Sequence, residues 1–529
     1  MRSFRELTFR GSQEIANLAL WAVPPRPPVD AVQDRTHLPD PSQVVARLKG
    51  TEYADQTVRL AEEVLAHRVP LLDRVIETGD AIDWRRDYTC GRSSPLRYFK
   101  LVPYLDIAQV GDHKWIWELN RHQHLVLLAQ AYCITKREQF SAEVFSQLES
   151  WISANPFMRG INWASALEVA FRALSWIWID HLLGARMDPL LYRRFLATLT
   201  RHGAYLEANL SIYFAPNTHL LGEALALYAI GLFYPSLPQA GRWRRRGSDL
   251  MNAQLDVQVR EDGSHFEQSS YYHLYALDMG LFFYVLAGRP EHLRPKLERM
   301  AEYLDALAGP ARTLPFLGDD DGGRLFHPYG RRDTFARANL ALCGVLFDRP
   351  EWITCTADLP EIAGWWLGTA CLDLRKPVSK PRASRLFPQA GIASMESGDR
   401  HVLVDAGAFG AVGAGHSHSD TLSLVASEEQ EEILVDAGTF TYVGDPDWRN
   451  WFRSSAAHNT LSVDGFDQAD PAHAFRWLNP PEVNIRNWTS SPERDYLDAT
   501  CSYRGFTHRR RVLFRKPDLV FVLDHIEGP

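Results

Sequence analysis

The sequence has few cysteines and no pairing pattern among them. Its 529 residues include 6 cysteines without C-x-x-C spacing, which excludes a disulfide framework and a thiolate metal site. No run of apolar residues approaches the roughly 20 needed for a membrane span. The N-terminus also lacks a long apolar segment with a small-residue cleavage site. We therefore expect no membrane span and a cytoplasmic location for the chain as given, or a periplasmic or secreted one if its N-terminus was trimmed.

An excess of positive charge is absent as well. The formal net charge is −8, so no overall field attracts a polyanion, and nucleic-acid binding is not supported. Two dense basic runs, at residues 242–246 and 509–511, are interpreted as a solvated helix end and an edge strand. An acidic substrate would need a local basic cleft. Aromatic residues make up 12% of the chain, which suits either sugar stacking or filling between helices.

Most of the chain has a helical pattern. Between residues 41 and 374, apolar residues recur at three- and four-residue intervals, as in ALEVAFRALSWIWIDHLL and YYHLYALDMGLFFYVLAG. Several such segments are apolar nearly all round, which is typical of inner helices packed on both sides. Successive helix pairs with short connections predict an α-solenoid or an α/α toroid over residues 1–375, with an N-terminal extension over residues 1–40.

The pattern changes to strands after a segment rich in Pro, Lys and Arg. Residues 376–389 are predicted to be an interdomain linker. Short β-type runs follow over residues 390–529, including the near copies VLVDAG and ILVDAG. They predict an antiparallel β-sandwich that is truncated at its C-terminus, because the chain stops soon after DLVFVLDHI. Helices followed by strands indicate an α+β chain of two domains, and the cleft between them is the expected ligand site.

Two helical segments carry polar side chains of the kind that form sites. In PNTHLLGEALAL, Asn217 is a candidate N-cap, and His219 and Glu223 lie four apart on one helical face. In DGSHFEQSSYYH, Glu267 and Tyr272 lie among several hydroxyl and aromatic groups. Such a cluster favours a cleft lining. The alternatives are local capping by Glu267 and a buried hydrogen bond between His219 and Glu223.

Further residues are expected to line the same cleft. WELNRHQH contains His122, and GINWASALEVAFRALSW places Asn162 and Trp163 at a helix start. Arg172 is expected to pair with Glu168, four residues before it. The loop LGDDDGG is similar to a calcium loop but lacks the later bidentate Glu, so it is interpreted as a solvated turn.

The most specific pattern is GHSHSD, followed later by LVDAG and AHN. In an extended segment His416, His418 and Asp420 would face one side, with Asp436 at the end of a later strand and His458 beyond it. Two imidazoles and a carboxylate suit Zn²⁺ or a similar divalent ion, with a fourth position for water or backbone. The alternative is a chance occurrence of histidines and aspartates that are distant in sequence.

Together, PNTHLLGEALAL, DGSHFEQSSYYH, GHSHSDTLSLVAS and ILVDAGTFTYVGDPDWRNWFRSSAAHNTLSVDGFDQ resemble the heparinase II/III-type polysaccharide lyases. The resemblance covers residues 110–525, with four blocks in the family's order. It implies an α/α toroid followed by an antiparallel β-sandwich. It also implies β-elimination on an acidic, uronate-containing polysaccharide such as a glycosaminoglycan or alginate.

The resemblance also assigns roles to individual residues. Tyr272 and His416 match the catalytic tyrosine and histidine, and Asn217 and His219 fall where one group neutralises the substrate carboxylate. Which of these two neutralises and which acts as base stays open, because several members have Asn and His adjacent. The matched metal ligands are His418, Asp436 and His458, for Zn²⁺ or alternatively Mn²⁺ or Ca²⁺. Substrate contacts are expected from Glu223, Asn162, Trp163, Arg172, His122 and Glu267.

This chemistry makes demands on the site. The reference pKa of tyrosine is about 10, so Tyr272 would need nearby positive charge to act as a base; histidines and a cationic cleft are expected to supply it. The metal is interpreted as mainly structural. Two other functions stay open. One is a glycoside hydrolase with a pair of carboxylates among Glu118, Glu168 and Glu267. The other is a non-catalytic protein that binds polysaccharide or assists its synthesis.

Overall fold

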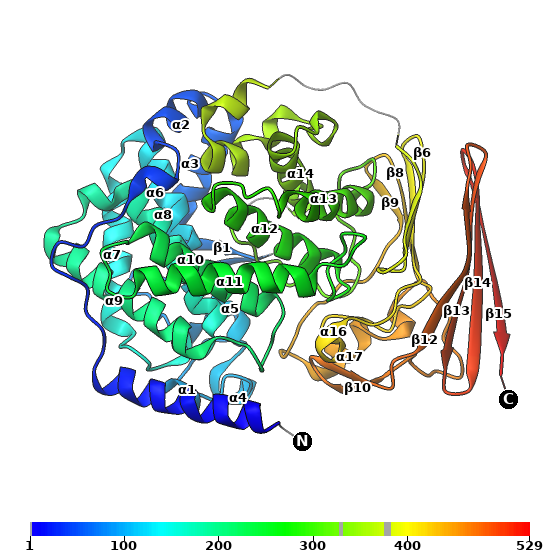
Figure 1. The fold of residues 1–529 in the computed structure, drawn as a ribbon, viewed down its shortest axis with the longest axis horizontal. Coiled ribbons are helices and arrows are strands. Elements are labelled where there is room, and N and C mark those ends of the chain that lie inside the picture. Colours follow the sequence, from blue (N-terminus) through cyan, green and yellow to red (C-terminus); the bar gives the residue numbers. More distant parts are fainter. Residues whose placement is uncertain (1–2, 73, 327–331, 375–381, 529) are drawn as a thin grey trace.

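The computed structural model describes residues 3–72, 74–326, 332–374 and 382–528. Figure 1 shows a helical body, coloured blue to green, beside a β-domain coloured yellow to red. The helices of the first domain are α1 (Phe4–Ala22), α2 (Pro41–Leu48), α3 (Glu52–Leu65), α4 (Ile107–Val110), α5 (His113–Asn120), α6 (Gln123–Thr135), α7 (Glu138–Ala154), α8 (Ala166–Leu183), α9 (Pro189–Asn209), α10 (Thr218–Phe233), α11 (Ala240–Gln258), α12 (Ser270–Leu286), α13 (Arg294–Ala308), α14 (Phe335–Leu346) and α15 (Trp365–Leu367).

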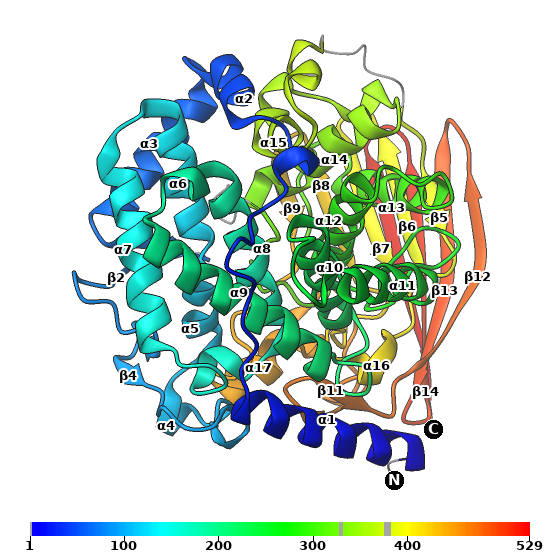
Figure 2. The same cartoon turned by 60° about the vertical axis from the view of Figure 1, so that its left-hand side comes forward.

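The helical body is an α/α toroid of inner and outer helices. The inner helices α6, α8, α10 and α12 are buried along nearly their whole lengths. Helices α7, α9, α11 and α13 alternate with them along the chain and bury one face each. Figure 2 shows these helices side by side. The sequence pattern therefore predicted the ring correctly, because helices packed on both sides have no polar face.

The β-domain consists of two antiparallel sheets that share one core. Met395 and Val404 of the first sheet face Leu497 and Phe514 of the second in this core, which is the packing of a β-sandwich. The first sheet has the order β5 (Arg385–Phe387), β6 (Ile392–Ser397), β7 (Arg400–Asp405), β8 (Leu424–Glu428), β9 (Glu431–Leu434), and the second β12 (Glu482–Ser490), β13 (Arg494–Tyr503), β14 (Phe506–Arg515), β15 (Leu519–Glu527).

Some segments differ from the prediction. Two short hairpins interrupt the helical region, β1 (Arg68–Leu71) with β2 (Arg74–Glu77) and β3 (Arg86–Asp87) with β4 (Arg92–Ser93). A third hairpin, β10 (Asp470–His473) with β11 (Arg476–Leu478), precedes the second sheet. Strand β5 lies inside the segment predicted as a linker, whose residues 376–381 lie outside the described residues. No helix among the described residues is both long and apolar enough to cross a membrane.

The two domains meet through backbone hydrogen bonds. The amide of Asp319, in the segment after α13, donates to the carbonyl of His416 at 2.9 Å, and the amide of Ala411 donates to the carbonyl of Phe266 at 2.9 Å. The short helices α16 (Ala411–Ala414) and α17 (Pro446–Phe452) lie on the side of the β-domain that faces the helical body (Figure 1). These contacts bring residues of DGSHFEQ and GHSHSD to one place.

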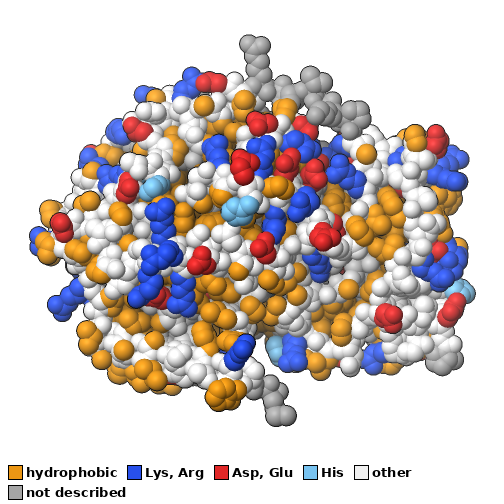
Figure 3. All heavy atoms as spheres, in the orientation of Figure 1, with side chains coloured by type: hydrophobic (Ala, Val, Ile, Leu, Met, Phe, Trp, Pro, Cys, Tyr) orange, Lys and Arg blue, Asp and Glu red, His pale blue; other side chains and the backbone are white. Residues whose placement is uncertain are grey.

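The surface has no broad field of one sign on the face drawn in Figure 3, where basic and acidic side chains are interspersed. The basic run of α11 is part of this pattern, because Arg242 and Arg246 both lie near the carboxylate of Glu207. This run lies near the start of α11, as the interpretation as a helix end requires. The run at residues 509–511 lies in β14, an inner strand of the second sheet, so its interpretation as an edge strand was wrong.

Candidate active site and metal centre

Tyr272 and His416 come together where the two domains meet. Tyr272 lies in the first turn of α12, where its amide donates to the Oγ of the N-cap Ser269 at 3.1 Å. His416 follows α16 in the β-domain. Their rings stack with centroids 3.7 Å apart and planes inclined by 18°. A phenol from the helical ring and an imidazole from the β-domain thus share one buried position.

His416 is held between two carboxylates. Its Nδ1 donates to Oδ2 of Asp319 at 3.0 Å, and its Nε2 lies 3.5 Å from Oε1 of Glu267. Burial alone would lower the pKa of His416, but the hydrogen bond to Asp319 and the charge of Glu267 outweigh burial, so the pKa is raised. The raised pKa favours an imidazolium, which can attract a substrate carboxylate.

Asn217 caps helix α10 and also bonds to Glu267 beside His416. As N-cap of α10, its Oδ1 accepts from the amide of His219 at 3.1 Å. Its Nδ2 donates to Oε1 of Glu267 at 2.6 Å. Glu267 therefore lies between Asn217 and His416 and orients both. The ring of His219 is partly exposed, and burial together with the neighbouring His416 lowers its pKa to about 4. His219 is therefore neutral at neutral pH and able to accept a proton.

The phenol of Tyr272 does not have the electrostatics that we expected. Its hydroxyl lies 3.0 Å from the hydroxyl of Tyr442, a residue that the sequence reasoning did not single out. Burial and the carboxylate of Asp321 raise the pKa of Tyr272 well above its usual value. The expectation of a lowered pKa was wrong, because burial disfavours the charged phenolate and the nearby aspartates raise the pKa further. A protonated Tyr272 is suited to donate a proton.

Asp319 is the main residue that the sequence reasoning missed. The loop LGDDDGG was interpreted as a solvated turn, but Asp319 has no exposed surface. Its carboxylate accepts hydrogen bonds from His416, His418 and Arg449. Burial would raise its pKa, but the charge of Arg449 and the histidine hydrogen bonds hold the pKa well below the usual range. The prediction failed because the burial of this loop depends on the other domain, which no local pattern reveals.

The two aspartates that follow fasten the same loop to other elements. Oδ2 of Asp320 lies 2.6 Å from Nη2 of Arg332. Oδ2 of Asp321 accepts from Nζ of Lys114 at 3.0 Å, and Lys114 also donates to Glu118 at 3.0 Å. These two aspartates anchor the loop to the helical domain, whereas Asp319 bonds it to the β-domain.

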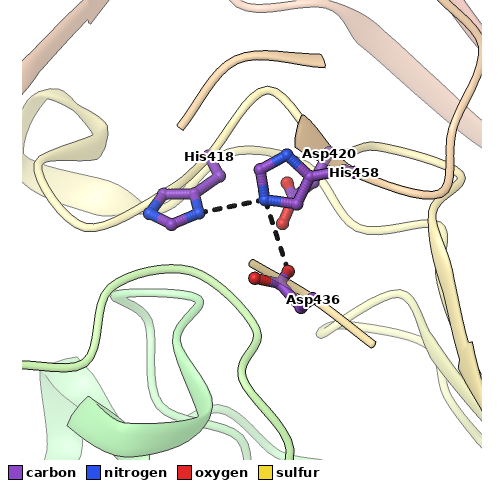
Figure 4. Close-up of side chains that lie close together, drawn as sticks. All are labelled: His418, Asp420, Asp436 and His458. Carbon is purple, nitrogen blue, oxygen red and sulfur yellow. Dashed lines mark hydrogen bonds and ion pairs between the residues drawn. The ribbon is translucent and has the colours of Figure 1, made fainter. Parts of the chain in front are cut away.

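Four buried side chains of the β-domain form a candidate metal centre (Figure 4). His418, Asp420, Asp436 and His458 each offer one ligand atom, and these atoms all lie within 4.8 Å of one another. Nδ1 of His418 lies 3.2 Å from Nε2 of His458, which lies 3.3 Å from Oδ2 of Asp436. Asp420 is an addition to the matched ligands. Residues 416–420 are irregular rather than extended, so His416 faces Tyr272 while His418 and Asp420 face the centre.

The donor set fits a divalent cation. Two nitrogen and two oxygen donors suit tetrahedral Zn²⁺. Three carboxylates crowd this place, because strand β7 ends at Asp405, whose carboxylate interacts with those of Asp420 and Asp436. Burial and the charge of Asp420 raise the pKa of Asp405 well above its usual value, and burial raises the pKa of Asp420. A bound cation would offset this accumulation of negative charge.

The other expected substrate contacts lie elsewhere. His122, Asn162, Trp163 and Arg172 are all buried in the helical core. Arg172 donates to the carbonyls of Asn120 and Asn162, and Glu168 pairs with Arg121 at 2.7 Å instead of with Arg172. None of these four residues forms a hydrogen bond or a ring contact with Tyr272 or His416 within the described part of the chain.

Glu223 is also inside the helical core. It accepts hydrogen bonds from the amide and the hydroxyl of Ser211, at 2.7 and 2.6 Å. Burial raises the pKa of Glu223 to about 8. Its expected partner His219 faces the site instead, and Glu223 holds the turn before α10.

Comparisons with known proteins agree with this architecture. Residues 32–324 match the family model described as "Heparinase II/III N-terminus", and residues 379–529 match "Heparinase II/III-like, C-terminal". A heparin-sulfate lyase of Bacteroides stercoris is 24% identical over 459 residues, covering 79% of this chain and 63% of that protein. A heparin-sulfate lyase of Pedobacter heparinus is 24% identical over 440 residues, covering 79% of this chain and 61% of that protein.

Solved structures share the fold. A crystal structure of heparinase III aligns with a TM-score of 0.70 at 17% identity, covering 98% of this chain and 75% of that chain. Another heparinase III aligns with a TM-score of 0.60 at 22% identity, covering 89% of this chain and 70% of that chain. By sequence, the chain spans somewhat less than two thirds of the length of the two heparin-sulfate lyases named above.

Proposed function

The chain belongs to the heparinase II/III family, and from this premise we propose that it is a polysaccharide lyase. The proposed substrate is an acidic polysaccharide that contains uronic acid, of the glycosaminoglycan class that the names of its relatives indicate. The observation that carries the proposal is the stacking of Tyr272 on His416, with ring centroids 3.7 Å apart. It supports a reaction in which groups from both domains act on one sugar.

The first requirement of β-elimination is to acidify the proton at C5 of the uronate. This proton is hardly acidic while the neighbouring carboxylate keeps its full charge. The cationic His416 and the amide of Asn217 are suited to bind that carboxylate and to stabilise the enolate-like state that forms. Removing one such donor typically costs ~3–4 kcal/mol of transition-state stabilisation.

The second requirement is a proton acceptor and a proton donor. His219 is neutral, because its pKa is lowered to about 4, so it can take the C5 proton. As C4=C5 forms and the C4–O bond breaks, the hydroxyl of Tyr272 can protonate the departing oxygen. For the opposite uronate epimer, Tyr272 would have to serve as both base and acid, which requires substrate binding to reverse the direction of its pKa shift.

We propose that His418, Asp420, Asp436 and His458 hold a divalent ion, with Zn²⁺ favoured over Mn²⁺ and Ca²⁺ by the two imidazoles. When bound, the ion would supply positive charge to a cluster of buried carboxylates and fix the segments that carry its ligands. Its role is structural.

A product assay separates this proposal from its alternatives. The protein is incubated with heparan sulfate, chondroitin sulfate and alginate, while ultraviolet absorbance and new reducing ends are followed together. A lyase raises both, because its product has a C4=C5 double bond. A hydrolase raises reducing ends alone, and a binding protein raises neither. The hydrolase is disfavoured because Arg121 forms ion pairs with both Glu118 and Glu168, so two of the three candidate carboxylates are already paired.

A further inference from the structure

We propose that Asp319 is a positioning residue that couples the metal centre to His416. One oxygen of its carboxylate fixes a metal ligand, and the other fixes the imidazole that stacks on Tyr272. Metal binding and the orientation of His416 would then depend on the same side chain. The effect on turnover rests on the proposed lyase function, whereas the effect on metal binding does not.

The two oxygens of Asp319 have separate partners. Oδ1 accepts from Nε2 of His418 at 2.9 Å, and Oδ2 accepts from Nδ1 of His416 at 3.0 Å. A carboxylate only accepts, so each of these ring nitrogens must carry the proton. This leaves Nδ1 of His418 for the metal centre, where it lies 3.2 Å from Nε2 of His458. It also turns Nε2 of His416 toward Glu267 and the site.

The carboxylate itself is fixed by Arg449. The guanidinium of Arg449 donates to both oxygens of Asp319, and both side chains are almost completely buried. A bidentate pair of this kind sets the plane of the carboxylate as well as its position. The two histidines therefore donate to carboxylate oxygens whose direction is fixed, rather than to an acceptor that rotates freely.

The backbone around Asp319 is tied to both catalytic groups. Its amide donates to the carbonyl of His416 at 2.9 Å, and its carbonyl accepts from Oγ of Ser269 at 2.6 Å. The same Ser269 oxygen caps the helix of Tyr272. Gly318 permits this approach: its φ is +65°, and a Cβ there would lie 2.6 Å from the carbonyl oxygen of His416.

The substitution Asp319→Asn tests the coupling with almost no change in volume. Its amide nitrogen would face donors of Arg449 and of one histidine, so at least one of those hydrogen bonds is lost. Loss of a hydrogen bond to a metal ligand typically costs about 10- to 100-fold in metal affinity or activity. We expect the affinity for Zn²⁺ to fall by about that factor. We also expect kcat to fall about 10- to 100-fold with KM changed less than about threefold, because binding groups remain.

The experiment is a zinc titration of chelator-stripped protein against a competing chelator, with circular dichroism to verify folding. Asp320→Asn is the matched control, since it removes one charge from the same loop while its partner is Arg332; its zinc affinity should stay within about twofold of wild type. Equal zinc affinities of Asp319→Asn and wild type would overturn the proposal, as would failure of wild type to bind zinc. Lyase inactivity of the wild type would overturn only the proposed function.

If Asp319→Asn does not fold, Arg449→Lys decides. Lysine is a point charge and cannot hold both oxygens of Asp319, so the carboxylate is loosened while its charge remains. We expect weaker zinc binding than in wild type, in the same direction as for Asp319→Asn. Unchanged zinc affinity in Arg449→Lys would contradict the proposed coupling.

Discussion

The phenol of Tyr272 lies nearly flat against the imidazole of His416, although the two residues belong to different domains. Their approach depends on the loop of Asp319, which is bonded to His416 and to the cap of the Tyr272 helix. Because the two stacked rings come from different domains, the site is formed by domain contact rather than by either domain alone.

Substitutions of Asn217 should separate its two roles. Asn217→Ala removes the helix cap and the amide donor, whereas Asn217→Ser keeps a capping oxygen but is too short to reach Glu267. We expect both variants to lose about 10²- to 10³-fold in kcat/KM, the usual cost of one donor to a developing anion. Only Asn217→Ala should also lose about 1 kcal/mol of unfolding free energy. Full activity of Asn217→Ser would show that the amide does not act on substrate.

Removal of one ligand should release the metal. We expect His418→Ala to lose the bound divalent ion and to unfold at a lower temperature, since an ion present at 100 times its Kd stabilises a protein by about 2.7 kcal/mol. His473→Ala is the control, because His473 is an exposed histidine of the same domain. Elemental analysis and thermal unfolding give the two readouts. The structural role fails if metal-free wild type unfolds at the same temperature as the loaded protein.

The buried Glu223 should make stability depend on pH. Its pKa of about 8 in the folded protein exceeds the ordinary value of 4.5, so between these values the folded protein holds a proton that the unfolded chain has released. Stability from this group is complete below about pH 4.5 and is lost as pH rises toward 8, by at most about 1.4 kcal/mol per pH unit.

The isosteric variant Glu223→Gln removes this titrating carboxyl group. Its unfolding free energy relative to wild type should therefore increase from pH 5 to pH 8 in urea denaturation. Parallel pH profiles of the two proteins would show that Glu223 is not held protonated in the fold.

The sequence predicted what depends on local periodicity. The inner helices α8, α10 and α12 have apolar residues on all sides. The β-domain consists of short β-type runs separated by turns, so both domains could be predicted. Tyr272 stood out in a cluster of hydroxyl groups on a buried helix, whereas His416 and the metal-ligand candidates stood out through the spacing of histidines and aspartates in GHSHSD and the later segments. The family resemblance then placed them in one site.

Residues whose surroundings come from distant segments could not be predicted. Asp319 is in a glycine-rich acidic loop that is indistinguishable in sequence from a solvated turn, and its burial depends on Arg449 from the other domain. Glu168 has Arg172 at the right helical spacing but pairs with Arg121 of another segment. His416 faces Tyr272 rather than the side of His418 and Asp420 because residues 416–420 are irregular, which a strand pattern does not anticipate.

The most direct test of the central claim compares Tyr272→Phe with Tyr271→Phe on the polysaccharide that the wild type cleaves. Tyr271 is the matched control, because its buried hydroxyl has no hydrogen-bond partner among the described residues. We predict that Tyr272→Phe loses about 10²- to 10⁴-fold in the rate of ultraviolet-absorbing product, as expected for a lost acid–base group, while it still binds the polysaccharide. Tyr271→Phe should keep the wild-type rate. Wild-type product formation by Tyr272→Phe would contradict the account.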